Sequence, residues 1–337
     1  MHYPWHSDQW QYLLRLKQRM PHALLLQGCA GIGKLDLAHA FAQAMLCESP
    51  QNTGHACGHC QACNWYAQGG HPDFRLLEPE SLSEQAGAEE KQTSKKPSTI
   101  ISVAQVRELA DFVNLSTHQH GKRVILIHPA EAMNPQAANS LLKILEEPAP
   151  NTLFILVSHQ PQRLLPTIRS RCHKIEIPLP ADELARRWLE EQGVVEAAAC
   201  LAQASRAPLR ALALNDADYQ AQRKAFLSEI ADPEKLDALI VAEKNAKADL
   251  PDLIEWWQKW VHDLMRLKMG APIQYQPDWE TSLRGLAKKV NLSRLLDFQR
   301  ELLAVRRALH HPLNSQLLLE KLLLNYSNIL TEEHGHG

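Results

Sequence analysis

Residues 28–35 read G-C-A-G-I-G-K-L, with the glycines and the lysine of a phosphate-binding loop. An apolar run at 23–26 precedes the loop and an amphipathic stretch at 35–45 follows it, so the sequence predicts a strand, a loop and a helix. Glycines let successive backbone N–H groups face phosphates, and the lysine adds a positive charge. The residues expected to bind nucleotide are Gly28, Gly31, Gly33 and Lys34. An ordinary glycine turn is the alternative.

The metal-binding part of such a site is missing. Leu35 stands where a Ser or Thr hydroxyl normally coordinates magnesium. A hydrolysing enzyme also needs an apolar strand that ends in adjacent acids, but the candidate strand at 124–127 is followed by His128 and Pro129. Glu131 lies two positions further on, where the strand geometry places it off the metal. We therefore expect that ATP or ADP can bind but is not hydrolysed.

Composition argues against a strongly basic nucleic-acid binding protein and against a membrane-spanning protein. The chain has 337 residues, of which 45% are hydrophobic and 22% charged, and its formal net charge is -2. These values are typical of a globular protein of two or three domains, and they provide no overall basic field for nucleic acid. DNA contacts must then be local or shared with partners. No apolar run is long enough to span a membrane, and no secretion signal is visible at the start. The expected location is the cytoplasm.

The distribution of apolar runs predicts the fold class. Runs at 23–26, 124–127 and 153–157 alternate with helical stretches, which predicts an α/β domain with a parallel sheet. From Asp182 onward the periodicity is helical almost to the end, and a break near 215–217 indicates two all-helical modules. The polar segment 78–99 is interpreted as a mobile surface loop, with a charged docking segment as the alternative.

A cluster of cysteines indicates a metal site. The four candidate ligands are Cys47, Cys57, Cys60 and Cys63. Four soft ligands at this spacing are typical of tetrahedral zinc, and a site closed by four protein ligands is structural. His55 or His59 could replace a thiolate. A redox role is the alternative, but a thioredoxin-type motif needs one C-x-x-C pair and not three consecutive thiols.

Two further motifs carry a family resemblance. Residues 141–148 read L-L-K-I-L-E-E-P, and residues 170–172 read S-R-C. Together with the phosphate-binding loop they resemble the AAA+ clamp-loader family, over essentially the whole chain. The cysteine cluster after the first helix is similar to the bacterial DNA polymerase III members, and the loss of both nucleotide motifs resembles those members that do not hydrolyse ATP.

This resemblance implies a fold, a function and a set of partners. The implied domains are an AAA+ α/β domain with a zinc module at about 47–63 (1–178), a helical lid (179–214) and a helical collar (215–337). The chain would join ATPase subunits (tau/gamma) and a delta subunit in a five-membered ring that loads the sliding clamp onto primer-template DNA. It would have no ATPase activity of its own, and would belong to the DNA-directed DNA polymerase holoenzyme without performing polymerase chemistry.

The resemblance also implies roles for two arginines. Arg171 in the S-R-C triplet would be an arginine finger that acts in trans on ATP bound by a neighbouring subunit, with Ser170 and Cys172 setting its position. An ordinary surface arginine beside Arg169 is the alternative. Arg210 matches the lid arginine that touches bound nucleotide, although a plain helix N-terminus explains this segment equally well.

Two other functions compete with this interpretation. One is an atypical AAA+ ATPase that works alone. The other is a zinc-dependent nucleic-acid binding protein, against which stand the near-neutral charge and the lack of basic residues in 57–63.

Overall fold

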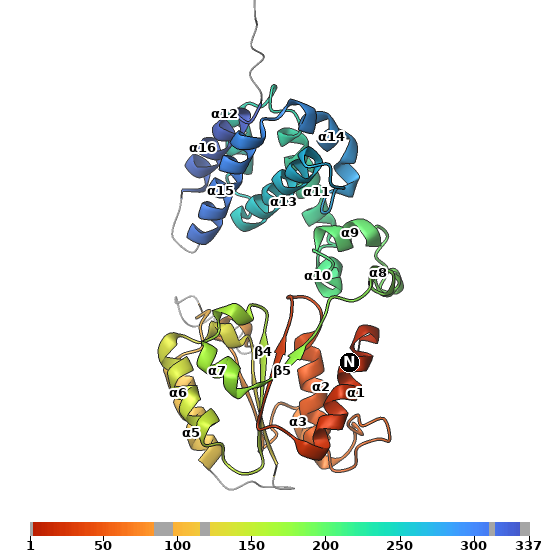
Figure 1. Cartoon of the computed structure of the whole chain (residues 1–337), viewed down its shortest axis with the longest axis vertical. Helices are drawn as coiled ribbons and strands as arrows, with labels where there is room; N and C mark the ends of the chain where they lie inside the picture. The colour runs from red at the N-terminus through yellow and green to blue at the C-terminus, as the bar shows by residue number, and fades with distance from the viewer. Residues whose placement is uncertain (1–2, 84–96, 115–121, 310–313, 331–337) are drawn as a thin grey trace, which may run out of the picture. The chain divides into compact units, whose positions relative to one another are not determined.

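The chain divides into two compact units. A computed structural model describes residues 3–83, 97–114, 122–309 and 314–330. The units are Met1–Leu184 and Ala185–Gly337, and Figure 1 labels their helices and strands. None of the helices in these described ranges combines the length and the apolar character that crossing a bilayer requires.

A parallel sheet forms the centre of the N-terminal unit. Its strands are β1 (Ala23–Gln27), β2 (Phe74–Leu77), β3 (Arg123–Ile127), β4 (Thr152–Ser158) and β5 (His173–Glu176). They lie in the order β2-β3-β4-β1-β5, and every neighbouring pair is parallel. The three predicted strands are β1, β3 and β4, which confirms the α/β prediction. The two edge strands were not predicted.

Helices cover both faces of this sheet (Figure 1). They are α1 (Ser7–Leu16), α2 (Lys34–Leu46), α3 (Gln61–Ala67), α5 (Val103–Asn114), α6 (Pro135–Glu146) and α7 (Pro166–Arg171). Alternate strand residues such as Leu25 and Phe154 pack with Leu141 of α6 and Ile168 of α7. The opposite face lies against α2, whose Phe41 is buried. Strands covered on both faces read as continuous apolar runs, which is why the central ones could be recognised.

Only the ends of the polar segment 78–99 are described. A turn of 3₁₀-helix, Glu80–Leu82, is joined to the returning chain by a hydrogen bond from the Ser81 amide to the Ser98 carbonyl at 3.0 Å. The Glu80 carboxylate accepts a second bond from the Ser98 amide, also at 3.0 Å. Residues 84–96 lie outside the described residues, so their interpretation as a surface loop stays a prediction.

The C-terminal unit is helical, as predicted from Asp182 onward. Helix α8 (Asp182–Glu191) crosses the boundary between the units. The helices that follow it are α9 (Ala197–Gln203), α10 (Pro208–Ala213), α11 (Ala217–Ile230), α12 (Ala238–Asn245), α13 (Leu250–Lys268), α14 (Glu280–Lys289), α15 (Leu292–Ala308) and α16 (Ser315–Ser327). Residues from α8 to α10 form a small core of their own. A larger core surrounds Trp257 and Trp260 of α13, which are fully buried.

Candidate functional site

The phosphate-binding loop connects β1 to α2. Its glycines have positive φ angles, 155° at Gly28, 77° at Gly31 and 80° at Gly33. Lys34 begins α2 and is only 2% exposed. Its Nζ donates a hydrogen bond to the Cys29 carbonyl, and burial lowers the pKa of the lysine to about 8. The lysine therefore makes its hydrogen bond within the loop itself.

Two of the glycines are required by their surroundings. A Cβ atom at Gly28 would lie 2.3 Å from the carbonyl oxygen of Ile177, which follows β5. A Cβ atom at Gly33 would lie 2.4 Å from the ring of Tyr3. Both distances are far inside van der Waals contact, and both residues have φ angles that side chains rarely adopt. Glycine is therefore the only residue that fits either position without rearrangement.

Aromatic residues at the start of the chain hold the loop. The Trp5 indole donates a hydrogen bond to the Ile32 carbonyl at 3.0 Å, and the His6 imidazole contacts the same oxygen at 2.8 Å. Tyr3 stacks on Trp5, with ring centroids 5.0 Å apart. Sequence reasoning missed this contact. The sequence shows several aromatic side chains in residues 3–6, but such a group does not indicate which residues the rings contact.

Two histidines follow the carboxyl ends of β3 and β4, and His128 occupies the position where a hydrolysing enzyme needs an acid. The Nε2 atoms of His128 and His159 lie 3.2 Å apart. Burial, and then the neighbouring His159, lower the pKa of His128 to about 4. The pKa of His159 is also lowered, chiefly by burial. Both rings are therefore neutral near pH 7, and neither supplies a carboxylate for magnesium.

Glu131 has a structural contact instead. Its Oε1 accepts hydrogen bonds from the backbone amides of His159 at 2.8 Å and Gln160 at 3.0 Å. The carboxylate thus holds the chain where it leaves β4. Leu35, one residue into α2, offers no polar atom. The described site has a phosphate cradle and a buried lysine, and the positions for metal binding carry a leucine, a histidine and a proline.

Arg171 lies at the end of α7, and its side chain is 34% exposed. Its Nη2 bonds to Oε1 of Glu146 at 2.5 Å, and its Nη1 donates to the Thr167 carbonyl at 3.0 Å. Ser170 donates to the same carbonyl at 3.0 Å. Cys172 is buried beneath the helix end, which raises the pKa of its thiol to about 11. The guanidinium is therefore oriented and open to solvent.

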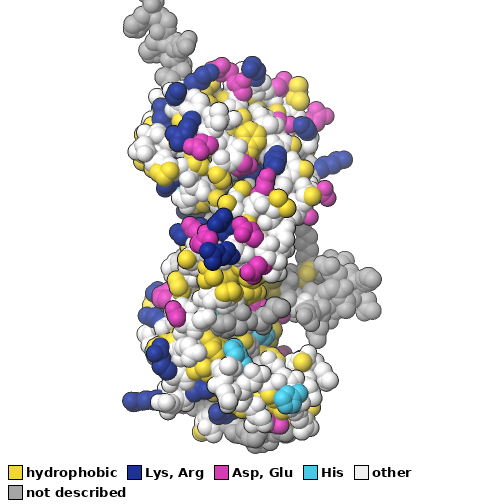
Figure 2. Space-filling model, turned by 90° about the vertical axis from the view of Figure 1, so that its right-hand side faces the viewer, with side chains coloured by type: hydrophobic (Ala, Val, Ile, Leu, Met, Phe, Trp, Pro, Cys, Tyr) yellow, Lys and Arg dark blue, Asp and Glu magenta, His cyan; other side chains and the backbone are white. Residues whose placement is uncertain are grey.

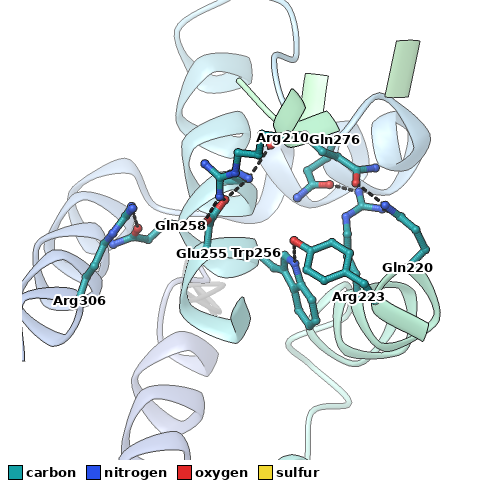
Figure 3. A network of polar contacts seen from close by, with 11 residues as sticks. Arg210, Gln220, Arg223, Glu255, Trp256, Gln258, Gln276 and Arg306 are labelled. Carbon is teal, nitrogen blue, oxygen red and sulfur yellow. Dashed lines mark hydrogen bonds and ion pairs between the residues drawn. The ribbon is translucent and has the colours of Figure 1, made fainter. Parts of the chain in front are cut away.

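Arg210 belongs to the C-terminal unit, in α10. Its guanidinium pairs with both carboxylate oxygens of Glu255 on α13, as Figure 3 shows. Lys259, one turn further along α13, pairs with the same carboxylate and donates to the Gln203 carbonyl at 2.5 Å. Burial alone would raise the pKa of Glu255, but Lys259 and Arg210 bring it below its usual range. Arg210 thus joins the small core of α8 to α10 to helix α13.

The four predicted cysteine ligands come together. The Sγ atoms of Cys47, Cys57, Cys60 and Cys63 all lie within 4.8 Å of one another. The Cys47–Cys60 and Cys57–Cys63 sulfur pairs are each 3.9 Å apart. Four thiolates bound at about 2.3 Å to one tetrahedral zinc ion would be separated by about 3.8 Å. The arrangement therefore has room for zinc.

Backbone amides donate hydrogen bonds to the sulfurs of this cluster. The amides of Cys57 and Cys60 donate to the sulfurs of Cys47 and Cys57 respectively, each at 3.3 Å. The His59 amide is the main cause that lowers the pKa of the Cys57 thiol to about 6. His55 stacks on Trp10 of α1, with centroids 4.0 Å apart, and the His59 Nδ1 contacts the Cys57 carbonyl at 2.9 Å. These contacts of the two histidines are with Trp10 and a backbone carbonyl, and the cluster that could hold a metal consists of the four cysteines.

Surface charge is mixed where it can be seen. Over the C-terminal unit, Lys and Arg side chains are interspersed with Asp and Glu on the face shown in Figure 2. The small formal net charge of -2 agrees with this pattern. Such a face lacks the single-sign field that steers nucleic acid to a protein.

Comparison with known proteins identifies the family. A family model described as "DNA polymerase III, delta subunit" matches residues 6–181, and one described as its C-terminal part matches residues 217–328. A Pseudomonas aeruginosa protein named DNA polymerase III subunit delta' is 36% identical, over 97% of this chain and 98% of that protein. The chain belongs to the delta-prime family of DNA polymerase III subunits. An Escherichia coli K12 delta' protein is 30% identical, over 97% and 96% of the two chains.

The matches cover both parts of this delta-prime chain. The first matched range includes the phosphate-binding loop, the cysteine cluster and Arg171, and the second covers the helices from α11 to α16. A solved Thermotoga maritima structure described as a DNA polymerase III, gamma subunit-related protein has a TM-score of 0.45 and 17% identity, over 96% of this chain and 99% of that one.

Proposed function

We propose that this delta-prime chain is a non-catalytic subunit of a clamp-loader complex, which helps to load a sliding clamp onto primed DNA. One observation carries the proposal: the exposed Arg171 belongs to a unit whose own phosphate-binding loop lacks metal ligands. A guanidinium that can stabilise phosphoryl transfer is of no use beside a site that cannot hydrolyse. Its place of action is then a nucleotide held by a neighbouring subunit.

In this proposal Arg171 acts as an arginine finger in trans. It exchanges the Glu146 carboxylate for phosphate oxygens of ATP in the adjoining ATPase subunit. Carboxylate and phosphate oxygens both accept hydrogen bonds from the planar guanidinium, so the single bond from Nη2 to Glu146 can be replaced. Fingers of this kind raise the hydrolysis rate by about 10³–10⁵. Ser170 and the buried Cys172 fix the helix end from which the arginine projects.

The chain's own loop would hold ATP or ADP without hydrolysing it. Lys34 would exchange the Cys29 carbonyl for phosphate oxygens, beside the N–H groups of Gly31 and Gly33. Because folding has already buried the lysine, an incoming phosphate would compensate a desolvated charge. For Arg210 to reach such a nucleotide, it would have to leave Glu255.

The cysteine cluster would bind a structural zinc ion. Its sulfur separations suit a tetrahedral site, and four protein ligands leave no position for a water molecule. When bound, zinc would fix the segment between α2 and α3, which α1 also holds through a hydrogen bond from the Trp10 indole to the Thr53 carbonyl at 3.1 Å.

The proposed partners are tau/gamma ATPase subunits and a delta subunit, in a five-membered ring that contacts the clamp and primer-template DNA in the cytoplasm. The proposed domains are an AAA+ domain (1–178), a lid (179–214) and a collar (215–337). Exposed apolar side chains on two packed helices support assembly through the collar: Leu239 and Ile240 on α12 are 61% and 63% exposed, and Leu317 and Leu324 on α16 are 62% and 55% exposed. Such side chains suit burial against partner helices.

Reconstitution tests the proposal. The chain is mixed with the tau/gamma and delta subunits, and DNA-stimulated ATPase activity is measured with wild type, Arg171→Ala and Arg163→Ala. Arg163 is the matched control, because it is also exposed and its hydrogen bond in the described structure is to Gln160, three residues away. We expect Arg171→Ala to remove most of the activity that depends on this chain, and Arg163→Ala to leave it. Equal activity with both variants contradicts the finger, and ATP turnover by the isolated chain contradicts the non-catalytic role.

A further inference from the structure

A small cavity in the C-terminal unit collects basic side chains. It measures about 240 Å³ and lies among α10, α13 and α15. Arg210 enters from α10 and Arg306 from α15, while Lys259 stands on α13 between them. Figure 3 shows the two arginines reaching toward α13, Arg210 to Glu255 and Arg306 to Gln258. None of these contacts belongs to the nucleotide loop, the cysteine cluster or the arginine finger.

The lining of this cavity carries excess positive charge. Among the described residues that line it, Glu255 is the only acid, and Arg210 and Lys259 share its carboxylate. Arg306 donates a hydrogen bond at 2.8 Å to Oε1 of Gln258, which is a neutral amide. The lining therefore has three basic side chains and one acid, and Asp252, which is outside the lining, also interacts electrostatically with Arg210 and Lys259. Like charges that line one cavity repel one another, and a bound anion would relieve that repulsion.

Polar atoms in the wall of the cavity also lack partners. The Nε2 of His262 and the Oε1 of Gln299 are buried and have no hydrogen-bond partner within the described structure. Lys259 is itself only 8% exposed. A buried polar atom without a partner costs about 1–3 kcal/mol, and two such atoms in residues that line one cavity suit an occupant that forms hydrogen bonds. A flip of the Gln299 amide would present its NH₂ group to that occupant.

We propose that this cavity binds a phosphate group. Guanidinium and ammonium groups are the side chains that bind phosphate most strongly, and here one approaches from each of three helices. The cavity is smaller than the pockets of about 300–1,000 Å³ that enclose drug-sized ligands. It therefore accepts one phosphate, either free or as part of a larger nucleotide or nucleic-acid strand that extends into solvent. This site goes beyond the proposed function, because it shares only Arg210 with the residues considered for nucleotide binding, and Lys259 and Arg306 have no part in that function.

The test uses the full chain with Lys34→Ala, which removes the side-chain charge of the loop and so weakens phosphate binding there. Isothermal titration calorimetry measures inorganic phosphate and pyrophosphate, and fluorescence anisotropy measures a labelled primer-template DNA. Arg306→Gln removes the arginine that pairs only with an amide. Arg307→Gln makes the same change at the next position of α15, outside the cavity lining. Circular dichroism melting confirms that both variants fold, as expected for substitutions of exposed side chains.

We expect at least one of these ligands to bind. Arg306→Gln should weaken the affinity for that ligand about tenfold, and Arg307→Gln should leave the affinity unchanged. Binding of phosphate or pyrophosphate identifies a free anion as the source, and binding of DNA alone identifies a strand. Absence of binding by every ligand overturns the proposal, as does an equal loss for the two variants. Because the outcomes rest on the comparison of Arg306→Gln with Arg307→Gln in the isolated chain, none of them depends on the proposed clamp-loader role.

Discussion

Arg171 of the S-R-C triplet is bonded to Glu146, the last residue of α6, at 2.5 Å. Glu146 belongs to the L-L-K-I-L-E-E-P segment, so the two motifs that resemble clamp loaders meet in one ion pair. The side chains of Arg171 and Glu146 are 34% and 49% exposed, and an ion pair this exposed contributes little to stability. Its effect is on the direction of the guanidinium.

Replacing Glu146 should show whether this residue only orients the Arg171 guanidinium or also takes part in ATP hydrolysis. We expect Glu146→Gln to change the free energy of unfolding by less than about 1 kcal/mol. The reconstituted ATPase should lose far less activity than with Arg171→Ala, because the Thr167 carbonyl still holds the arginine. Urea unfolding and DNA-stimulated ATPase measurements check both points. A loss as large as that of Arg171→Ala would mean that Glu146 itself takes part at the partner's site.

The cysteine cluster should bind a single zinc ion. Mass spectrometry of the purified chain should detect the metal, and Cys60→Ser should lose it and lower the thermal midpoint, because binding energy at a structural site is folding energy. Cys29→Ser is the control, since Cys29 is exposed and lies outside the cluster. A chain that contains no metal, or a Cys60→Ser variant that keeps it, would refute the assignment.

Because Lys34 is buried, the free energy of unfolding should change with pH in the alkaline range. Folding lowers its pKa from 10.5 to about 8, so between these values the unfolded chain binds the proton more tightly. The free energy of unfolding therefore rises with pH across this window, by up to about 3 kcal/mol for this residue. Lys34→Met should lack this rise. Urea unfolding of wild type and Lys34→Met near pH 7.5 and near pH 10 gives the contribution of Lys34, as the difference between the two proteins in how much their free energy of unfolding changes with pH. An equal change in both proteins would contradict this prediction.

The Glu255 carboxylate should contribute more to the free energy of unfolding than an acid on the surface does. Its side chain is 16% exposed and that of its partner Lys259 is 9% exposed, so Glu255→Gln leaves a buried ammonium without a counter-charge. We expect a loss of about 3–5 kcal/mol in the free energy of unfolding. Glu280→Gln breaks the exposed pair with Arg284 and should cost less than about 1 kcal/mol. Similar losses in the two variants would show that Glu255 does not hold the arginine and lysine in place.

Exposed leucines of α16 should matter for assembly and not for folding. Leu317 is 62% exposed, so Leu317→Glu should leave the thermal midpoint of the isolated chain unchanged. Buried in a ring interface, the same charge should weaken co-purification with tau/gamma and delta subunits at least about tenfold. The neighbouring Gln316→Glu is the control. Assembly of Leu317→Glu at wild-type strength would remove this helix from the interface.

The sequence allowed prediction of those features that depend on local pattern. Buried central strands, the glycine loop and the closely spaced cysteines each give a signal within a few residues. The edge strands β2 and β5 contain exposed and polar residues such as Arg75 and Lys174, so they lack the apolar run that identified β1. The contact between Trp5 and the loop, and the pair of Arg210 with Glu255, join residues distant in sequence. No local pattern encodes such partners.

The glycines of the loop have a consequence for mutational screens. Gly28 has no room for a side chain beside the Ile177 carbonyl, and Gly33 has none beside Tyr3. A library selected only for correct folding, with no nucleotide present, should therefore still return glycine at these two positions. Lys34 makes no such steric demand, since its ammonium can be removed without a clash. A screen that selects for replication should therefore be judged by whether lysine is enriched at position 34, because that enrichment reports nucleotide binding. Retention of the two glycines does not report nucleotide binding.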